Sequence, residues 1–235
     1  MGQVFEMEKK LAKYLMIAMP LYSAIAVPTF NSFIVSLSSL PAMVEKIGIS
    51  MIGGSYVHLT RREIAKDILG RDEKSPVDYI LWIDHDSVFS PQDIAGMLMT
   101  ANENKTDILS GFYVQKHRPE IPLIYLKNKK GDGFAAVDDV PKDSLFEVDS
   151  VGFGFNLMRM DVLKKLIWKY GLEKLFNVSD EKGKDIGEDF LFCSLAKKEG
   201  FKIWVNSAIK IGHYGGVITP EIHYAMKEFG EKKGK

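Results

Sequence analysis

The stretch Tyr79-Ile80-Leu81-Trp82-Ile83-Asp84-His85-Asp86 decides how this sequence is interpreted. Five largely apolar residues followed by a polar turn are typical of a strand that is buried on both faces of a parallel sheet. In an extended chain, Asp84 and Asp86 project to one side and His85 projects to the other. The stretch therefore predicts an open α/β sheet that delivers two carboxylates at its carboxyl edge, where such sheets bind ligands.

The residues around this stretch alternate apolar strands with amphipathic helices, which indicates a mostly parallel sheet with helices on both faces. Ser90 and Pro91 form a typical helix start, with Ser90 as the N-cap. We expect strands at 14–19, 47–52, 79–83 and 107–112, and helices at 28–40, 58–69 and 91–101. After Gly111 the rhythm breaks, and we expect short antiparallel strands at 122–126 and 134–137, helices at 161–170 and 188–199, and a strand at 202–205.

We see no linker or internal repeat in the sequence. Residues 1–235 are therefore expected to form a single α/β domain whose sheet has a mixed edge. Residues 1–13 and 229–235 are expected to be flexible ends.

Composition narrows the class of protein. Of the 235 residues, 46% are hydrophobic and 26% are charged, which is typical of a globular chain. The 31 basic and 31 acidic residues cancel, so no overall positive field favours nucleic acid or an anionic membrane as a partner. The one cysteine, Cys193, excludes an internal disulfide and favours a reducing compartment, so we expect a cytoplasmic protein.

The run 14–44 contains no charged residue, and its length raises the question of a transmembrane segment. Pro20, Pro28 and Pro41 interrupt it, and several serines would be poorly satisfied in lipid. A signal peptide fits no better, because Glu6 and Glu8 stand where a basic flank is required. We expect a buried strand and a helix here, and no transmembrane segment.

Three groups of residues are candidates for chemistry. Asp84 and Asp86 can hold a hard divalent cation such as Mg²⁺ or Mn²⁺, although Asp86 can equally start a turn. The adjacent Glu188 and Asp189 open a helix, where acids also complement the helix dipole. His213 lies in Gly212-His213-Tyr214-Gly215-Gly216, and it is either a third metal ligand or an ordinary packed histidine.

Taken in order, these motifs resemble a glycosyltransferase of the GT-A fold, most similar to the family-two group that uses nucleotide sugars. The run 79–86 matches the strand that ends in the Asp-x-Asp motif of that fold, and 107–116 resembles the strand and loop after it. Residues 146–159, FEVDSVGFGFNLMR, resemble the segment before the acceptor side. Gly187-Glu188-Asp189 resembles the acidic motif of the catalytic helix, and His213 stands where many members keep a metal-binding histidine. The resemblance runs from Tyr14 to Gly216.

The resemblance implies a single GT-A-type, Rossmann-like domain that moves a sugar from a nucleoside diphosphate to an unidentified hydroxyl acceptor, with inversion. It also implies a cofactor, Mn²⁺ or Mg²⁺, which would stabilise the charge on the leaving diphosphate. Asp86 and His213 would ligate the metal directly, and Asp84 would ligate it through water or contact the ribose. The second strand ends in Gly53-Gly54 without an acid to read the base, so uridine and guanosine donors both stay open.

Other roles follow from the same resemblance. Tyr22 would stack on the base. Arg61, in preference to Arg62, would contact the diphosphate. The implied nucleotide-binding set is Pro20, Tyr22, Arg61, Asp84 and His85.

On the acceptor side, the resemblance implies that Gly152, Phe153 and Gly154 form a turn that shapes the sugar pocket. Asp189 would be the general base, in preference to Glu188, because side chains of adjacent helical residues point about 100° apart and cannot share that role. We also expect the segment 212–219 to close over bound nucleotide.

Two readings from other classes compete with this one. In a haloacid-dehalogenase-like phosphohydrolase, Asp84 would be the nucleophile and Asp86 the acid-base, but that enzyme usually begins with this strand, and here about 80 residues precede it. A non-catalytic sugar-binding domain on the same fold is the other alternative. A sugar nucleotidyltransferase is disfavoured, because its glycine-rich loop with arginine is missing after the first strand.

Overall fold

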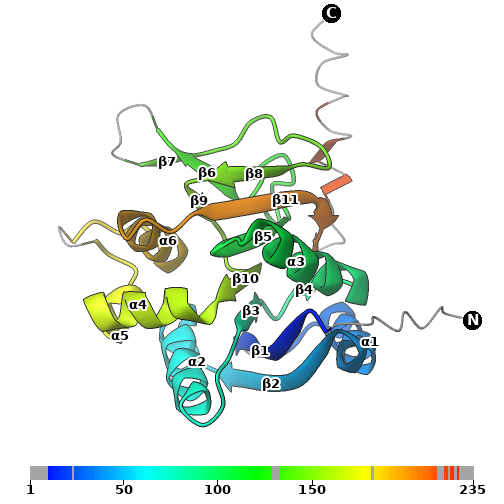
Figure 1. Ribbon diagram of the computed structural model, residues 1–235. Helices are drawn as coiled ribbons and strands as arrows, with labels where there is room; N and C mark the ends of the chain where they lie inside the picture. The colour runs from blue at the N-terminus through cyan, green and yellow to red at the C-terminus, as the bar shows by residue number, and fades with distance from the viewer. Residues whose placement is uncertain are drawn as a thin grey trace, which may run out of the picture.

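A seven-stranded sheet forms the centre of the computed structural model, which describes residues 10–22, 24–128, 133–180 and 183–215, and residues 220, 221, 223, 224 and 227 (Figure 1). The strand order is β2-β1-β3-β10-β5-β11-β8. The bounds are β1 Ala12–Leu21, β2 Val44–Gly53, β3 Tyr79–Ile83, β5 Ile108–Phe112, β8 Leu145–Val148, β10 Phe155–Arg159 and β11 Ile203–Lys210. The expected mixed α/β sheet is confirmed.

The direction of one strand, β10, differs from the expectation that only the edge of the sheet is mixed. β1 is parallel to β2 and β3, and β5 is parallel to β11. β8 lies antiparallel at the edge, as a mixed edge requires. β10, however, is antiparallel inside the sheet, where it pairs with both β3 and β5. The expected mixing of directions is therefore not confined to the edge.

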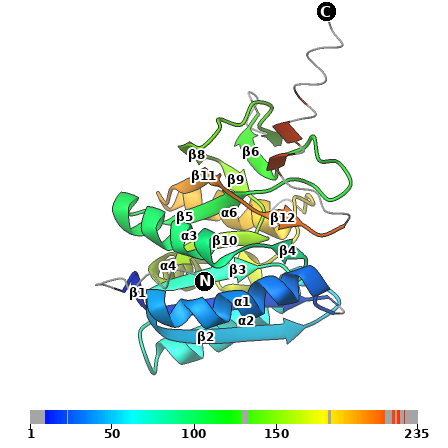
Figure 2. The same ribbon diagram turned by 90° about the vertical axis from the view of Figure 1, so that its right-hand side faces the viewer.

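Helices cover both faces of the sheet, as Figures 1 and 2 show. α1 (Val27–Met43) and α3 (Pro91–Asn104) lie on one face, while α2 (Val57–Asp72), α4 (Met160–Tyr170), α5 (Leu172–Leu175) and α6 (Glu188–Lys198) lie on the other. Along β1, Leu15 and Ile17 face the first group and Met16 and Ala18 face the second. This alternation, which follows from the two-residue period of a strand, gives the molecule two buried cores.

Two smaller sheets complete the fold. β6 (Ile124–Lys127), β7 (Phe134–Ala136) and β9 (Ser150–Val151) form an antiparallel sheet beyond the β8 edge, and two of its strands were expected from the sequence. β4 (Ser87–Val88) pairs with β12 (Gly212–His213). This second pairing brings His213 next to the segment that follows β3, although the two are far apart along the chain.

Element boundaries follow local chemistry. Ser90 caps α3 through a capping box with Asp93, as expected from the Ser-Pro-x-Asp pattern. β1 begins at Ala12, so Ala12 and Lys13 belong to the sheet and not to a flexible end. β11 continues to Lys210, five residues beyond its expected end. Residues 229–235 lie outside the described residues.

The uncharged run 14–44 is divided between the buried β1 and α1. α1 turns Thr29, Ser32 and Ser36 toward the interior, and the Ser32 hydroxyl accepts a hydrogen bond from the backbone N–H of Phe89 at 3.1 Å. Its outer side exposes apolar residues that include Val27 and Phe30. Among the described residues, no helix combines the length and apolar character needed to cross a bilayer.

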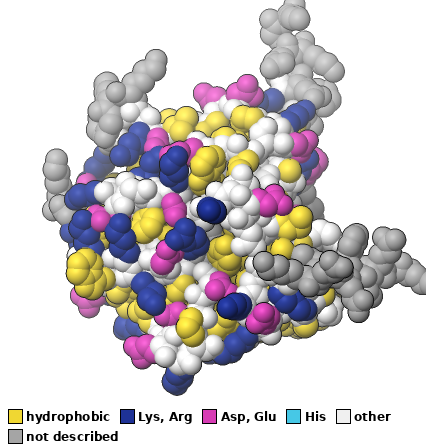
Figure 3. Space-filling model, in the orientation of Figure 1, with side chains coloured by type: hydrophobic (Ala, Val, Ile, Leu, Met, Phe, Trp, Pro, Cys, Tyr) yellow, Lys and Arg dark blue, Asp and Glu magenta, His cyan; other side chains and the backbone are white. Residues whose placement is uncertain are grey.

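The charged side chains on the face shown in Figure 3 are of both signs, and Lys and Arg lie beside Asp and Glu over much of it. This arrangement agrees with the equal numbers of basic and acidic residues in the sequence. Anion recognition by this chain therefore depends on a local arrangement of charges.

Candidate functional site

A cavity of about 290 Å³ lies at the carboxyl ends of β1 and β3, beside the start of α2. It is the position at which an open α/β sheet presents a ligand site. The structure brings six sequence-predicted residues to this cavity, and its lining is Pro20, Leu21, Tyr22, Gly54, Val57, Thr60, Asp84, His85, Asp86 and His213. The Tyr22 side chain is 67% exposed, so its ring is available to a ligand.

Asp86 is the most buried carboxylate of the cavity, with 6% of its surface exposed. Its Oδ2 forms an ion pair with Lys116 Nζ, and its Oδ1 lies 3.6 Å from His213 Nε2. Burial alone would raise the pKa of Asp86, but the hydrogen bonds from His213 and Lys116 outweigh burial and hold this pKa below its ordinary value. Asp86 is therefore a permanently charged acceptor at neutral pH.

His213 is oriented from both sides of its ring. Its Nδ1 lies 2.9 Å from the carbonyl oxygen of Val114, so Nδ1 carries a proton and donates it, and Nε2 faces Asp86. Burial opposes the charged form, but the contacts with Asp86 and the Val114 carbonyl raise the pKa of His213 above its ordinary value. The pairing of β12 with β4 fixes the backbone that carries this ring.

Asp84 points to a different partner from Asp86. Its Oδ1 accepts a hydrogen bond from Arg61 Nη2 at 2.8 Å. Arg61 is only 3% exposed and also forms an ion pair with Glu188. Arg62 instead donates to the carbonyl oxygens of Glu173 and Phe176, each at 3.2 Å. Of the two arginines, Arg61 is the one at the acidic site.

Arg61 is held by two acidic side chains, and its expected contact with a diphosphate stays a prediction. The guanidinium bridges Asp84 and Glu188 and is not among the described residues that line the cavity. In this structure Arg61 joins α2 to the end of β3 and to the start of α6, and so holds the acidic residues together.

Glu188 and Asp189 lie in different environments although they are adjacent. Glu188 is held by Arg61, while Oδ1 of Asp189 accepts a hydrogen bond from the backbone N–H of Phe190 at 2.8 Å. Burial, with a smaller contribution from the charge of Glu188, raises the pKa of Asp189 to about 6. The two adjacent acids therefore differ in their partners: Glu188 is bound to a guanidinium and Asp189 to a backbone N–H.

The glycines on either side of Phe153 make room for another side chain of the fold. A Cβ atom on Gly152 would lie 2.5 Å from the Tyr113 hydroxyl oxygen, and one on Gly154 would lie 2.9 Å from Tyr113 Cε2. The glycines thus make room for the buried Tyr113 ring, whose hydroxyl accepts a hydrogen bond from the Gly154 N–H at 2.8 Å. Phe153 is buried, with its ring 4.9 Å from that of Phe192, so its side chain belongs to the core and not to the cavity.

The turn is nevertheless adjacent to the acidic residues. The Gly154 carbonyl oxygen accepts hydrogen bonds from the Asp84 N–H at 2.9 Å and from the Ser87 hydroxyl at 2.7 Å. The turn therefore lies directly against the segment of the Asp-x-Asp motif. That the turn contacts a sugar stays a prediction.

Substitutions can show which atom of Tyr113 requires each of the two glycines. Gly152→Ala and Gly154→Ala should each lower the free energy of unfolding by about 1–3 kcal/mol, because each overpacks against Tyr113. In a Tyr113→Phe background, the Gly152→Ala cost should vanish, since only the hydroxyl oxygen is in the way, whereas the Gly154→Ala cost should persist. Urea unfolding measures both, and Gly70→Ala, which meets no atom within 4 Å, is the control. A Gly152→Ala cost that is as large in the Tyr113→Phe background as in the original chain would contradict this account.

The residues at the cavity fit a divalent metal only in part. Among the described residues, no group of three His, Cys, Asp or Glu side chains is arranged to hold a metal ion. Asp86 and His213 supply one carboxylate and one imidazole whose other nitrogen is anchored to a carbonyl, which is the usual support of a metal-binding histidine. Mg²⁺ and Mn²⁺ are often bound by few protein ligands, with substrate phosphates completing the shell, so this pair fits.

Comparisons with known proteins show a similarity of fold only. No family model matches the sequence, and no curated protein matches it. Among solved structures, the chain is similar to A197 from STIV, with 18% sequence identity and a TM-score of 0.62. The match covers 89% of this chain and 91% of that one. The fold is therefore shared over nearly the whole length.

Sequence reasoning missed Lys116 and Tyr113. Lys116 lies in a basic surface-like stretch with His117 and Arg118, so nothing in its local pattern indicates that it reaches Asp86. Tyr113 lies in the segment expected after the fourth strand, but its packing against the glycine pair depends on contacts 40 residues away. The expected closing segment begins in β12, and its residues 216–219 lie outside the described residues.

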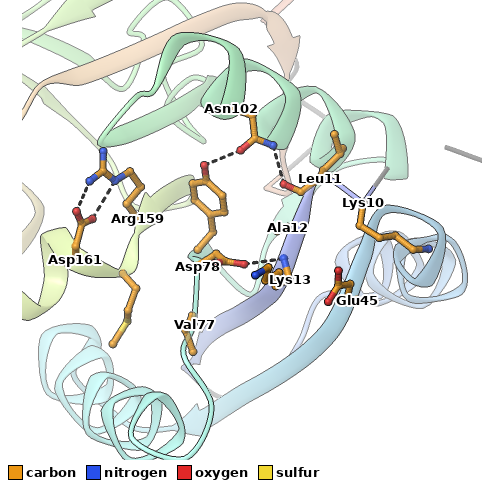
Figure 4. Close-up of a pocket in the computed structure, with 12 residues that line it drawn as sticks. Lys10, Leu11, Ala12, Lys13, Glu45, Val77, Asp78, Asn102, Arg159 and Asp161 are labelled. Atoms are coloured by element: carbon orange, nitrogen blue, oxygen red, sulfur yellow. Dashed lines mark hydrogen bonds and ion pairs between the residues drawn. The ribbon is translucent and has the colours of Figure 1, made fainter. Parts of the chain in front are cut away.

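A larger cavity, of about 550 Å³, lies at the opposite end of the sheet (Figure 4). Its polar side chains already serve the fold: Asp78 accepts hydrogen bonds from the backbone N–H groups of Lys13 and Tyr14, and Asn102 donates to the Leu11 carbonyl. The Arg159 side chain forms an ion pair with Asp161. Since these groups tie the amino ends of β1 and β3 to their neighbours, we assign no ligand to this cavity.

Proposed function

We propose that this chain is a metal-dependent glycosyltransferase that moves a sugar from a nucleoside diphosphate, of uridine or guanosine type, to a hydroxyl acceptor with inversion. One observation carries the proposal. An exposed aromatic ring, two carboxylates and an oriented histidine share one cavity at the carboxyl edge of the sheet, and a pair of acids at the start of α6 is tied to it through Arg61.

The donor would occupy this cavity. Tyr22 offers a free ring face on which a base can stack, and Gly54 leaves the neighbouring wall without a side chain. The diphosphate would lie toward Asp86 and His213, which would hold the Mn²⁺ or Mg²⁺ ion. That ion would supply positive charge to the leaving diphosphate.

The acceptor hydroxyl would give its proton to Asp189. With a pKa of about 6, this carboxyl is mostly ionised at neutral pH and is a stronger base than an ordinary aspartate. Glu188 is engaged by Arg61 and would act by positioning. The start of α6 holds both acids on a fixed backbone, which favours a defined direction of proton transfer.

The ion pair between Asp84 and Arg61 favours the transferase over the phosphohydrolase. A nucleophilic aspartate attacks through a free carboxylate oxygen, and Oδ1 of Asp84 is already bound by a buried guanidinium, which leaves only Oδ2. The positive charge of Arg61 draws electron density from the whole carboxylate, so it also weakens Oδ2 as a nucleophile.

The test is a calorimetric titration with UDP, GDP and ADP, each with Mn²⁺ and with excess chelator. We expect one uridine or guanosine nucleotide to bind best, and its affinity to fall at least about tenfold on chelation and in Asp86→Ala, since a charge-assisted contact contributes about 1.5–3 kcal/mol. Glu63→Ala, which removes an exposed acid paired with Lys66, is the matched control. Equal affinity with and without metal would overturn the metal-dependent site.

A further inference from the structure

Lys116 is held against Asp86 by the fold around it. Its Nζ pairs with Asp86 Oδ2 while its side chain is 31% exposed. The backbone before Lys116 is fixed, because the Gln115 N–H donates to the Ile121 carbonyl at 2.9 Å and Val114 forms a bridge with Pro122. After Lys116, the Arg118 carbonyl accepts a hydrogen bond from the Ile121 N–H at 2.9 Å. The ammonium group is thus presented by an ordered segment.

Gly215 completes this arrangement. A Cβ atom at position 215 would lie 2.3 Å from Lys116 Cγ and 2.7 Å from its Cδ, so the side chain of Lys116 runs directly over this glycine. The preceding Tyr214 N–H donates to the Asp86 carbonyl oxygen at 2.7 Å. The turn after β12 therefore fixes both Asp86 and the path of Lys116.

The positive charge of Lys116 affects whether a metal ion can bind to Asp86. Asp86 is one negative group, and it already has Lys116 and His213 as neighbours on its two oxygens. A divalent cation that approaches Asp86 meets the Lys116 ammonium at ion-pair distance, and like charges at a few ångströms repel strongly in a partly buried site. Metal can bind well only if the ammonium moves away.

We propose that Lys116 is a built-in cation that occupies the carboxylate of Asp86 in the ligand-free chain and that turns to the diphosphate when a metal ion takes its place. The inference deepens the proposed function and rests on it for the identity of the diphosphate. Lys116 is thus a positioning residue that makes the metal and the phosphates bind as a pair and disfavours the metal alone. A phosphate group supplies the negative partner that the displaced ammonium needs.

The experiment measures two affinities that should change in opposite directions. Binding of Mn²⁺ alone, followed by electron paramagnetic resonance of free Mn²⁺, should become at least about tenfold tighter in Lys116→Met, since one unit of opposing charge is removed. Binding of inorganic pyrophosphate in the presence of saturating Mn²⁺ should become at least about tenfold weaker in the same variant, because the displaced ammonium is no longer there to meet the phosphates.

Three further variants sharpen the test. Lys116→Arg keeps the charge and should behave as the original chain in the Mn²⁺ titration. Gly215→Ala should tighten Mn²⁺ binding without altering the lysine, because its Cβ displaces the Lys116 stem. Lys202→Met removes an exposed lysine paired with Glu147 and should change neither affinity.

The outcomes separate this inference from the proposed function. A Lys116→Met variant that binds Mn²⁺ no tighter than the original chain overturns the inference, and so does one that keeps its pyrophosphate affinity. A variant that loses both affinities indicates a structural role for Lys116 and also overturns it. If the two affinities change in opposite directions but no nucleoside diphosphate binds the original chain with metal, the inference holds and the proposed glycosyl transfer fails.

Discussion

Replacing Asp189 by Asn is expected to lower the rate of sugar transfer by about 10²- to 10⁴-fold, because the variant keeps the size of the side chain and removes the proton acceptor. The rate is measured as release of nucleoside diphosphate from the donor selected by titration. In the original chain, the rate should fall as the pH drops below about 6, since a pKa raised to about 6 means that the base is protonated there. An ordinary aspartate would lose activity only near pH 4.

Glu188→Gln is the matched control for this variant. It should cost less in rate, and it should shift the acid limb of the pH profile to lower pH, because Glu188 contributes to the raised pKa of Asp189. Nucleotide and metal binding should survive in Asp189→Asn, since Asp86 and His213 are unchanged. A larger loss in Glu188→Gln would move the base to Glu188, and full activity in both variants would remove this motif from the reaction.

Folding stability separates loss of activity from loss of structure. Burial raises the pKa of Asp189 above its unfolded value, so ionised Asp189 destabilises the fold above about pH 6, and this penalty disappears as the pH falls below the unfolded pKa. Asp189→Asn should therefore be at least as stable as the original chain at pH 8. A loss of stability at that pH would mean that the rate effect cannot be assigned to the base.

Replacing Arg61 by Met is expected to lower the free energy of unfolding by about 3–5 kcal/mol, the usual cost of removing one partner from a buried ion pair. The guanidinium is 3% exposed and neutralises Asp84 and Glu188, which are themselves mostly buried. Burial disfavours its charge, but the surrounding acids outweigh burial and raise the pKa of Arg61. Urea unfolding at pH 7 measures the effect.

Two controls test whether uncompensated charge causes this loss. Arg62→Met removes hydrogen bonds to two carbonyl groups and should cost only about 1 kcal/mol. Adding Asp84→Asn and Glu188→Gln to Arg61→Met should recover more than half of the lost stability, because the neutral amides no longer need a counter-charge. If the triple variant is as unstable as the single one, packing of Arg61 and not its charge carries the effect.

Local patterns in the sequence predicted most of the elements, and their failures have a common cause. The apolar run of β3, the helix start at Ser90 and the buried strand at residues 14–19 depend on neighbouring residues, and each was confirmed. No strand was expected at β10, in which Asn156 and Arg159 stand among the apolar residues, and the sequence does not say which strands it joins. Its antiparallel position between β3 and β5 depends on contacts between segments far apart in the chain.

For the site, the sequence by itself determined that two carboxylates follow a buried strand, that a histidine lies between glycines and that two acids open a helix. These are statements about order along the chain, and topology turned some of them into proximity because carboxyl ends of parallel strands meet at one edge. Only the tertiary structure decided that Arg61 binds Asp84 and Glu188, that Lys116 reaches Asp86 and that the glycine pair receives the Tyr113 ring. The physical reason is that a long side chain pairs with an opposite charge, or packs into free space, on an element that is distant in sequence. The local sequence pattern does not show which element that is.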